Sequence, residues 1–181
     1  MTLVTAGAVM GFGLSSCSDD VLDNLVKVSF TETVEVPFTL QPIDTIGVET
    51  PMVFLTTYFN LDSVIAAETN GRFDLAGIRS VTLNELRVEL DSTETDAANN
   101  LSNFEHVNLQ FYSDAVTAPL TFPVMVPDVY STRLTVPVDD ETDLKPYMEG
   151  NLLTYSVSGK MRRTTEKTLT GVVTMRIKVE E

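Results

Sequence analysis

The sequence predicts an all-β protein: one antiparallel β-sandwich of about seven or eight strands, with Greek-key connections and one or two short helices. Two observations lead to this prediction. Apolar and polar residues alternate with period two along most of the chain, which is typical of strands that bury one face in a core. Turn signals separate these runs at short intervals, and helical patterns are confined to two short stretches. A small β-barrel is the alternative architecture.

The clearest strand covers residues 26–40. Apolar side chains occupy one parity from Val26 to Leu40, and only Glu32 breaks that face. A period of two over this length indicates a strand with one face in a core and the other in water. Pro37 lies on the polar parity and indicates an edge strand or a bulge, because proline has no N–H to donate to a neighbouring strand.

The next strands are less regular. Residues 52–61 are apolar on both parities, which suits a strand that is covered on both sides or lies at an interface. Alternation in residues 78–90 slips by one position at residues 84–85, which predicts a β-bulge. Residues 107–111 alternate again, and we expect them to pair with 78–90 across the polar loop at 91–100.

The second half of the chain carries four more strand patterns. They lie at residues 122–127, 134–138, 153–161 and 169–179. Prolines at the ends of the first two are expected to blunt an exposed sheet edge. The last two are expected to form a terminal hairpin with its turn at residues 164–167, and Gly171 fills one inward position of the returning strand.

Two short helices are predicted, at residues 61–67 and 139–150. The candidate N-cap residues are Asp62 or Ser63 for the first helix and Asp140 or Thr142 for the second. Asn70-Gly71 is expected to end the first helix, and Gly150 is a candidate C′ residue of the second. Pro146 limits the second helix to one or two turns.

Composition indicates an acidic globular protein. The 181 residues carry a formal net charge of −14, and 43% of them are hydrophobic while 21% are charged. Such acidity argues against nucleic acid as a partner, because contact with phosphates needs a basic surface. Cys17 is the only cysteine, so the sequence offers no disulfide and no cysteine-based zinc site. We expect no cofactor and no metal site.

The N-terminal segment is an uncharged apolar run that begins at Leu3 and closes with Leu14-Ser15-Ser16-Cys17. It is shorter than the roughly 20 apolar residues that a transmembrane helix needs. The closing tetrapeptide resembles a bacterial lipoprotein lipobox, in which an aliphatic residue and two small residues precede the cysteine. The resemblance implies that Cys17 is lipidated and becomes the mature N-terminus, so that the membrane is a partner through an N-terminal lipid anchor.

The resemblance also divides the chain into three parts. They are a signal peptide at residues 1–16, a lipidated acidic tether at 17–24 and the β-sandwich domain at 25–181. An ordinary secretory signal and a buried N-terminal strand are the alternatives, although the glycines of the segment would weaken a strand. No Lys or Arg precedes the apolar run, which departs from signal-peptide anatomy and leaves the true translation start open.

Ser18-Asp19-Asp20 directly follows the cysteine. It resembles the acidic signal that routes lipoproteins of Bacteroidetes to the outer face of the outer membrane, with fewer acids than that signal often has. The order of the predicted strands is similar to that of small hypothetical lipoproteins of Bacteroidetes. These resemblances imply a β-sandwich that is lipid-anchored in the outer membrane and displayed at the cell surface. Display on the periplasmic face is the alternative. They imply no activity.

No catalytic set is visible in the sequence, and we do not expect an enzyme. His106 is the only histidine and lies on the polar parity of its strand, which indicates a solvent-facing residue. No serine stands in a Gly-x-Ser-x-Gly motif. The acid clusters at residues 91–96 and 139–143 lack the spacing of a calcium-binding EF-hand loop. Paired carboxylates of the glycosidase type would leave no trace in a sequence, so a carboxylate-based hydrolase remains an alternative function.

The predicted function is therefore a non-enzymatic, membrane-anchored interaction or structural module that binds an envelope protein through loops or a sheet edge. The candidate docking residues are the basic side chains Lys160, Arg162, Arg163 and Lys167 of the terminal hairpin. Cross-strand salt bridges and protection of a sheet edge are the competing explanation for these charges. A surface lipoprotein that binds a glycan or small ligand through its tyrosines is the alternative function.

Overall fold

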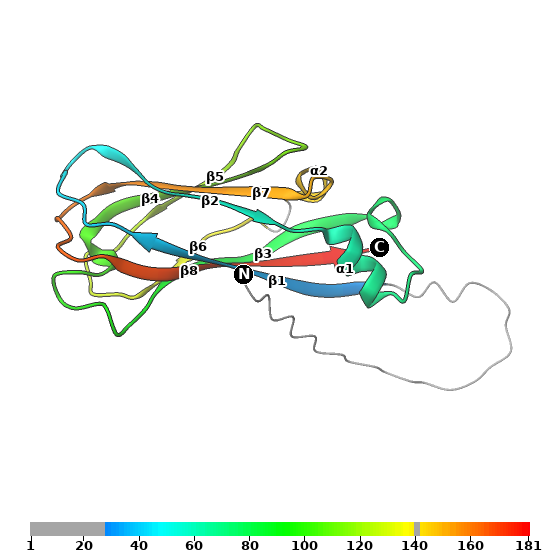
Figure 1. Ribbon diagram of the computed structural model, residues 1–181, viewed down its shortest axis with the longest axis horizontal. Helices are drawn as coiled ribbons and strands as arrows, with labels where there is room; N and C mark the ends of the chain where they lie inside the picture. Colours follow the sequence, from blue (N-terminus) through cyan, green and yellow to red (C-terminus); the bar gives the residue numbers. More distant parts are fainter. Residues whose placement is uncertain (1–27, 140–141) are drawn as a thin grey trace, which may run out of the picture.

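The computed structural model describes residues 28–139 and 142–181, which form a β-sandwich of two four-stranded antiparallel sheets (Figure 1). The strands are β1 (Ser29–Leu40), β2 (Glu49–Tyr58), β3 (Ser80–Leu90), β4 (Phe104–Ser113), β5 (Leu120–Met125), β6 (Arg133–Val136), β7 (Leu152–Met161) and β8 (Leu169–Glu180). One sheet has the order β1-β8-β3-β6 and the other β2-β7-β4-β5; we call them the β1 sheet and the β2 sheet. The predicted sandwich is confirmed, and the sheets do not close into a barrel.

The strand pairing is that of a jelly roll. β1 pairs with β8, β2 with β7, β3 with β6 and β4 with β5, so the chain pairs with itself as one long nested hairpin. Winding this hairpin brings β8 beside β3 and β7 beside β4, which produces two sheets with Greek-key connections. The outermost pair joins Ser29 to Glu180, so the two ends of the sandwich domain lie side by side.

Two predicted strand pairings are wrong. β3 and β4 lie in different sheets, and β7 and β8 also lie in different sheets instead of forming a terminal hairpin. The segments that connect them, residues 91–103 and 162–168, cross from one sheet to the other. Alternation specifies which face of a strand is buried, and it is the same for a hairpin and for a crossover between sheets. The pattern therefore could not distinguish the two.

The edge strands confirm one prediction and correct another. β1 is an edge strand, as Pro37 indicates, and β3 has a register shift between Leu83 and Glu85 at the predicted bulge. β2 is not covered on both sides: it is an edge strand without a buried side chain, and Phe54 and Tyr58 are 67% and 68% exposed. The other interpretation of its sequence, a strand at an interface, stays a prediction.

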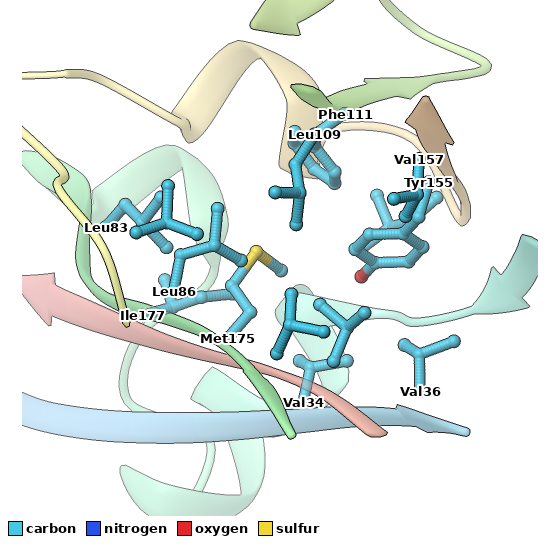
Figure 2. Packing of buried hydrophobic residues seen from close by; sticks show 14 of the residues in the cluster. Val34, Val36, Leu83, Leu86, Leu109, Phe111, Tyr155, Val157, Met175 and Ile177 are labelled. Carbon is cyan, nitrogen blue, oxygen red and sulfur yellow. The ribbon is translucent and has the colours of Figure 1, made fainter. Parts of the chain in front are cut away.

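The hydrophobic core fills the space between the two sheets. Figure 2 shows part of it: Val34, Val36, Leu83, Leu86, Leu109, Phe111, Tyr155, Val157, Met175 and Ile177. Gly171 occupies an inward position of β8, as predicted. A Cβ atom there would lie 2.5 Å from the backbone oxygen of Glu89 and 2.6 Å from Cζ of Phe38, so only glycine fits without displacement of its neighbours.

The first helix has a different cap from the predicted one. α1 (Leu61–Glu68) is capped by Asn60, whose Oδ1 accepts a hydrogen bond from Ser63 N at 2.7 Å. Asp62 instead accepts a hydrogen bond from Leu75 N at 2.7 Å and holds the segment that follows the helix. The predicted end of the helix is confirmed, because residues 70 and 71 both have positive φ angles.

The second helix, α2 (Lys145–Met148), is shorter than predicted. Pro146 stands in its first turn, where a missing N–H costs nothing, but the residues before it cannot continue the helix. The N-cap is Leu144 and not Thr142, and Asp140 lies outside the described residues.

Gly150 follows α2 but is not the predicted left-handed C′ residue, because its φ angle is not positive. Asp114 approaches it so closely that a Cβ would collide with the carboxylate, which accepts a hydrogen bond from Leu152 N at 3.1 Å. Two 3-10 turns complete the fold, at Leu75–Gly77 and Leu101–Asn103.

Candidate functional site

The two ends of the sandwich differ in structure. β1 begins, β8 ends and both α-helices lie at one end (Figure 1). Four connections lie at the opposite end, and we call them the distal loops: residues 41–48, 91–103, 126–132 and 162–168. Each distal loop joins a strand of one sheet to a strand of the other, so together they close that end of the core.

Buried asparagines hold the distal loops together. Asn99 Oδ1 accepts a hydrogen bond from Glu166 N at 2.7 Å, and Asn103 Nδ2 donates to the backbone oxygens of Ala98 and Thr164, both at 2.7 Å. Both asparagine side chains are almost fully buried. Their bonds satisfy backbone groups that would otherwise lack a partner, and they tie the second distal loop to the fourth.

Asn100 extends the same network. It is fully buried, its Oδ1 accepts from Ser102 N at 2.9 Å, and its Nδ2 donates to Asp96 O at 2.9 Å. Leu101 N donates to Ser131 O at 2.9 Å, which joins the second distal loop to the third. The sequence predicts a polar loop at residues 91–100, which contains Asn99 and Asn100 but not Asn103, and it does not predict the network. The only signal was a pair of asparagines directly before an apolar residue.

Arg162, one of the predicted docking residues, clamps this network from the fourth distal loop. Its Nη1 donates to the backbone oxygens of Ser102 and Phe104 at 2.8 Å each, and its Nη2 donates to Val126 O at 3.1 Å. The planar guanidinium suits such convergent carbonyl groups. Both Nη atoms thus bond within the chain, and a docking role for Arg162 stays a prediction.

The other predicted docking residues form ion pairs at the same end of the molecule. The pairs are Lys160 with Glu105 at 2.8 Å, Arg163 with Asp128 at 2.5 Å, and Lys167 with Asp96. Each pair is partly exposed, so solvent screens it and its contribution to stability is small. The structure brings all four basic residues together, but it places a carboxylate beside each of these three. Their docking role stays a prediction.

Asp96 is the most heavily engaged of these carboxylates. It accepts hydrogen bonds from Lys167 Nζ, from Asn99 Nδ2 at 2.9 Å and from Ala98 N at 2.9 Å. These bonds, with that of Lys167 the largest cause, lower the pKa of Asp96 to about 2, because every donor stabilises the charged form. Asp96 is therefore ionised at neutral pH and holds the fourth distal loop against the second.

Large apolar side chains remain exposed on the distal loops. Ile46 and Val48 lie on the first loop, and Val129 and Tyr130 lie on the third. The hydroxyl of Tyr130 is 3.0 Å from Oγ1 of Thr95, which links its loop to the second. Because the loops are already held by hydrogen bonds, a partner that contacts these side chains would lose little energy in ordering them.

His106 lies in a short polar cluster on the outer face of the β2 sheet. Its Nε2 is 2.6 Å from Oε2 of Glu49, and Ser158 Oγ donates to Oε1 of the same carboxylate at 2.7 Å. The histidine side chain is 30% exposed. The serine contacts the carboxylate and not the imidazole, so the cluster lacks the contact between nucleophile and base that a catalytic triad needs.

An open groove of about 1110 Å³ lies beside β1 and β2. Its walls include Met52–Leu55 of β2, Phe38 of β1 and residues of β3 and β8. The groove contains two phenylalanines and none of the five tyrosines, so it is not the tyrosine-lined site that the alternative function anticipates.

A cavity of only about 10 Å³ lies in the core beside Tyr155. The Tyr155 hydroxyl points into the core (Figure 2) and has no hydrogen-bond partner among the described residues. Burial raises the pKa of this hydroxyl, because the charged form cannot be solvated there. The space is about that of one water molecule and is too small for a ligand.

Three further observations bear on the predicted sites. The lipobox residues Leu14, Ser15, Ser16 and Cys17 and the tether lie outside the described residues. Within residues 28–139 and 142–181, no group of three or more His, Cys, Asp or Glu side chains is arranged to hold a metal ion. Among the helices of this part of the chain, none is long and apolar enough to cross a membrane.

Comparison with known proteins adds little to this description. No family model and no curated protein matches the chain. Among solved structures, a chain of Desmodium yellow mottle tymovirus is similar over 99% of this chain and 94% of its own, with 12% identity and a TM-score of 0.27. A chain of the empty head of turnip yellow mosaic virus is similar over 96% and 91%, with 10% identity and a TM-score of 0.25. Such low scores carry no argument, so the jelly-roll assignment rests on strand order alone.

Proposed function

We propose that this protein is a lipid-anchored envelope protein that binds a partner protein through its distal loops and performs no catalysis. The lipobox resemblance at Leu14-Ser15-Ser16-Cys17 supports the anchor. The observation that carries the binding role is the hydrogen bonding of the distal loops, which holds Val129 and Tyr130 in exposed positions. The first loop, with the exposed Ile46 and Val48, is held by bonds from Gly47 N to Met161 O and from Thr165 N to Ile43 O, both at 3.0 Å. Rigid loops on a β-sandwich are a common location for binding residues.

The direction of β1 supports this arrangement. The strand begins near residue 28, at the end closer in sequence to the proposed anchor, and runs to the distal loops through 12 residues. At about 3.3 Å per residue, this strand carries the chain roughly 36 Å along the sandwich. An anchor at Cys17 would therefore join the sandwich at the end opposite the distal loops, which leaves these loops accessible to a partner.

The anchor is tested by metabolic labelling with a palmitate analogue, together with proteinase digestion of intact cells. We expect the wild-type chain to be labelled and Cys17→Ala to lose the label. Digestion of the labelled protein on intact cells is the result expected for surface display, whereas protection indicates a periplasmic face. An unlabelled wild-type chain would contradict the anchor.

The distal loops are tested by crosslinking the full chain in cells. Ile46→Ser and Val129→Ser remove exposed apolar side chains from two distal loops, and Leu152→Ser removes one from the opposite end as a matched control. We expect a specific adduct that both distal variants weaken and the control retains, with unchanged melting temperatures. An adduct equally strong in all three variants would place the contact elsewhere and contradict the role of the loops.

Glycan binding is the second candidate, and one observation favours it. The rings of Phe54 and Tyr112 lie 6.3 Å apart at an angle of 54° on the outer face of the β2 sheet, beside the uncharged side chains of Thr56 and Thr154. Aromatic faces with neutral polar neighbours suit sugars. Affinity electrophoresis in soluble polysaccharides should then show retardation that Tyr112→Ala abolishes and Tyr130→Ala retains; no retardation in any polysaccharide would exclude this candidate.

A further inference from the structure

The four edge strands of the sandwich are not equivalent, and β1 shows how an edge is protected. The hydrogen bond from Glu181 N to Val28 O continues the β1–β8 register, so the even-numbered residues of β1 are hydrogen-bonded to β8. Its odd-numbered residues therefore point their backbone groups toward solvent. Among these are Glu35 and Pro37, a charge and a residue without an N–H, and both disfavour the addition of another strand.

The same reasoning applies to β5 and β6. The bond from Val126 N to β4 makes Pro123 of β5 an outward-facing position. The bond from Leu90 N to the residue before β6 makes Arg133, and Pro137 just beyond the strand, outward-facing as well. These two strands are also short, with six and four residues. These three edges thus carry a proline at an outward-facing position, and β2 carries one as well, Pro51 opposite Ser158, but only before its bulge.

The part of β2 that follows its bulge lacks this protection. Phe59 N donates to Asn151 O in the β2–β7 register, so Phe54, Thr56 and Tyr58 point their N–H and C=O groups away from β7. None of these positions is a proline or a charged residue, and none of their backbone groups has a partner within residues 28–139 and 142–181. The bulge after Pro51 confines this open edge to the part of β2 that follows it.

The groove described above runs beside this open edge. Met52–Leu55 form one wall, and Phe38 of β1 contributes an apolar surface. Four charged residues line the groove, and Glu89 is paired with Arg87 and with Arg133. The other two, Glu35 and Asp91, form no ion pair within residues 28–139 and 142–181, so they supply the excess negative charge. A strand added to β2 would form backbone hydrogen bonds with β2 along one edge. Its alternate side chains would contact the apolar surface of the groove, and carboxylates would lie nearby.

We propose that β2 binds an extended segment of a partner polypeptide as an additional strand. The segment has uncharged, apolar side chains at alternate positions, which enter the groove, and a Lys or Arg at its end, which meets the excess carboxylates. Its backbone pairs with the six outward groups of Phe54, Thr56 and Tyr58. Main-chain bonds then supply affinity and the groove supplies specificity. A second copy of this chain is disfavoured, because each copy carries a net charge of −14. This proposal does not depend on the anchor or on the distal loops.

The test uses the full chain and a pooled library of synthetic ten-residue peptides. Each peptide has Lys at both ends, apolar residues at alternate positions and Ser or Thr between them; a second library has Glu at both ends. We expect binders from the first library only. In amide exchange, Phe54, Thr56 and Tyr58 should exchange rapidly in the free chain and become protected with the bound peptide.

Two matched controls separate strand addition from other contacts. Thr56→Pro removes an outward N–H from β2, and Thr33→Pro removes one from the equivalent position of β1. Loss of a hydrogen bond predicts about tenfold weaker binding for Thr56→Pro and unchanged binding for Thr33→Pro. If Thr56→Pro does not fold, N-methylated peptides replace it. Methylation of the alternate peptide N–H groups that face β2 should abolish binding, and methylation of the N–H groups that face away from β2 should not.

Several results would overturn the proposal. They are the absence of binders in the Lys library, binders that leave the amides of Phe54, Thr56 and Tyr58 unprotected, and equal binding by the two sets of N-methylated peptides. Protection of the same amides without peptide, together with a concentration-dependent dimer in sedimentation, would assign the edge to a second copy instead.

Discussion

Single polar side chains determine the shape of the distal loops. Arg162 and the buried asparagines at 99, 100 and 103 supply hydrogen bonds to backbone groups of three different loops. Buried backbone groups need such partners, since the cost of leaving one unpaired is comparable to a lost hydrogen bond. These residues lie in irregular structure, where no periodic pattern exists, and so sequence analysis could not assign their roles.

Arg162 provides the first prediction. Arg162→Ala should lower the free energy of unfolding by about 2–3 kcal/mol, because it removes a donor from the oxygens of Phe104 and Val126 and leaves Ser102 O with Arg163 Nη2 alone. Arg133→Ala is the matched control, since its guanidinium is mostly exposed and makes one ion pair, and its loss of unfolding free energy should be much smaller. Urea denaturation measures both; equal losses would contradict the clamp.

Asp96 provides a pH-dependent prediction. Its pKa is about 2 in the folded chain against an ordinary value of 3.8, so the ionised carboxylate stabilises the fold above about pH 4. That contribution is lost as the pH falls through the folded pKa toward 2. The difference in unfolding free energy between wild type and Asp96→Asn should therefore be largest above pH 4 and shrink toward pH 2. A difference that stays constant over this range, in denaturation curves at each pH, would contradict it.

At the scale of elements, the close packing of β8 against β3 and β1 depends on a glycine. Gly171→Ala should reduce the free energy of unfolding by about 1–3 kcal/mol, because the new Cβ would meet the backbone oxygen of Glu89 at 2.5 Å. Gly77→Ala is the control: its Cβ would meet nothing closer than 3.5 Å, and its φ is not positive. Equal stability of Gly171→Ala and wild type in urea would mean that β3 can move aside.

The elements also show what sequence can and cannot specify. Strand positions, the bulge in β3 and the edge position of β1 follow from alternation, from its slip at 84–85 and from Pro37, each of which has a local cause. Strand partners are a different matter, because β7 and β8 have the pattern of a hairpin and lie in different sheets. At the distal loops, the sequence indicated only the four basic side chains, whose docking role stays a prediction. Their carboxylate partners come from β4 and from two other distal loops, and the exposed apolar side chains there were not predicted, because loops have no periodic pattern.

At the scale of the whole molecule, the two outer faces of the sandwich differ in charge. The β1 sheet carries ion pairs of Arg87, Arg133 and Arg176 with Glu85 and Glu89. The β2 sheet has its charges near the distal end and is otherwise uncharged, with Phe54 and Tyr58 exposed. Burying an uncharged face requires no loss of charge hydration, so the β2 sheet is the better surface for a partner.

The jelly-roll pairing makes all eight strands necessary for folding, which is the last prediction. β8 lies between β1 and β3 and pairs with both, and its partners are up to about 150 residues away in sequence (Ser29 pairs with Glu180). Contacts of such long range fold slowly, in milliseconds to seconds, because loop closure precedes the gain from pairing. A chain that ends at residue 168 should therefore lack a stable fold, although it retains seven of the eight strands. The control, residues 28–181, should show dispersed amide resonances and cooperative unfolding. Native-like dispersion in the truncated chain would mean that β1 and β3 can pair without β8, against the observed strand order.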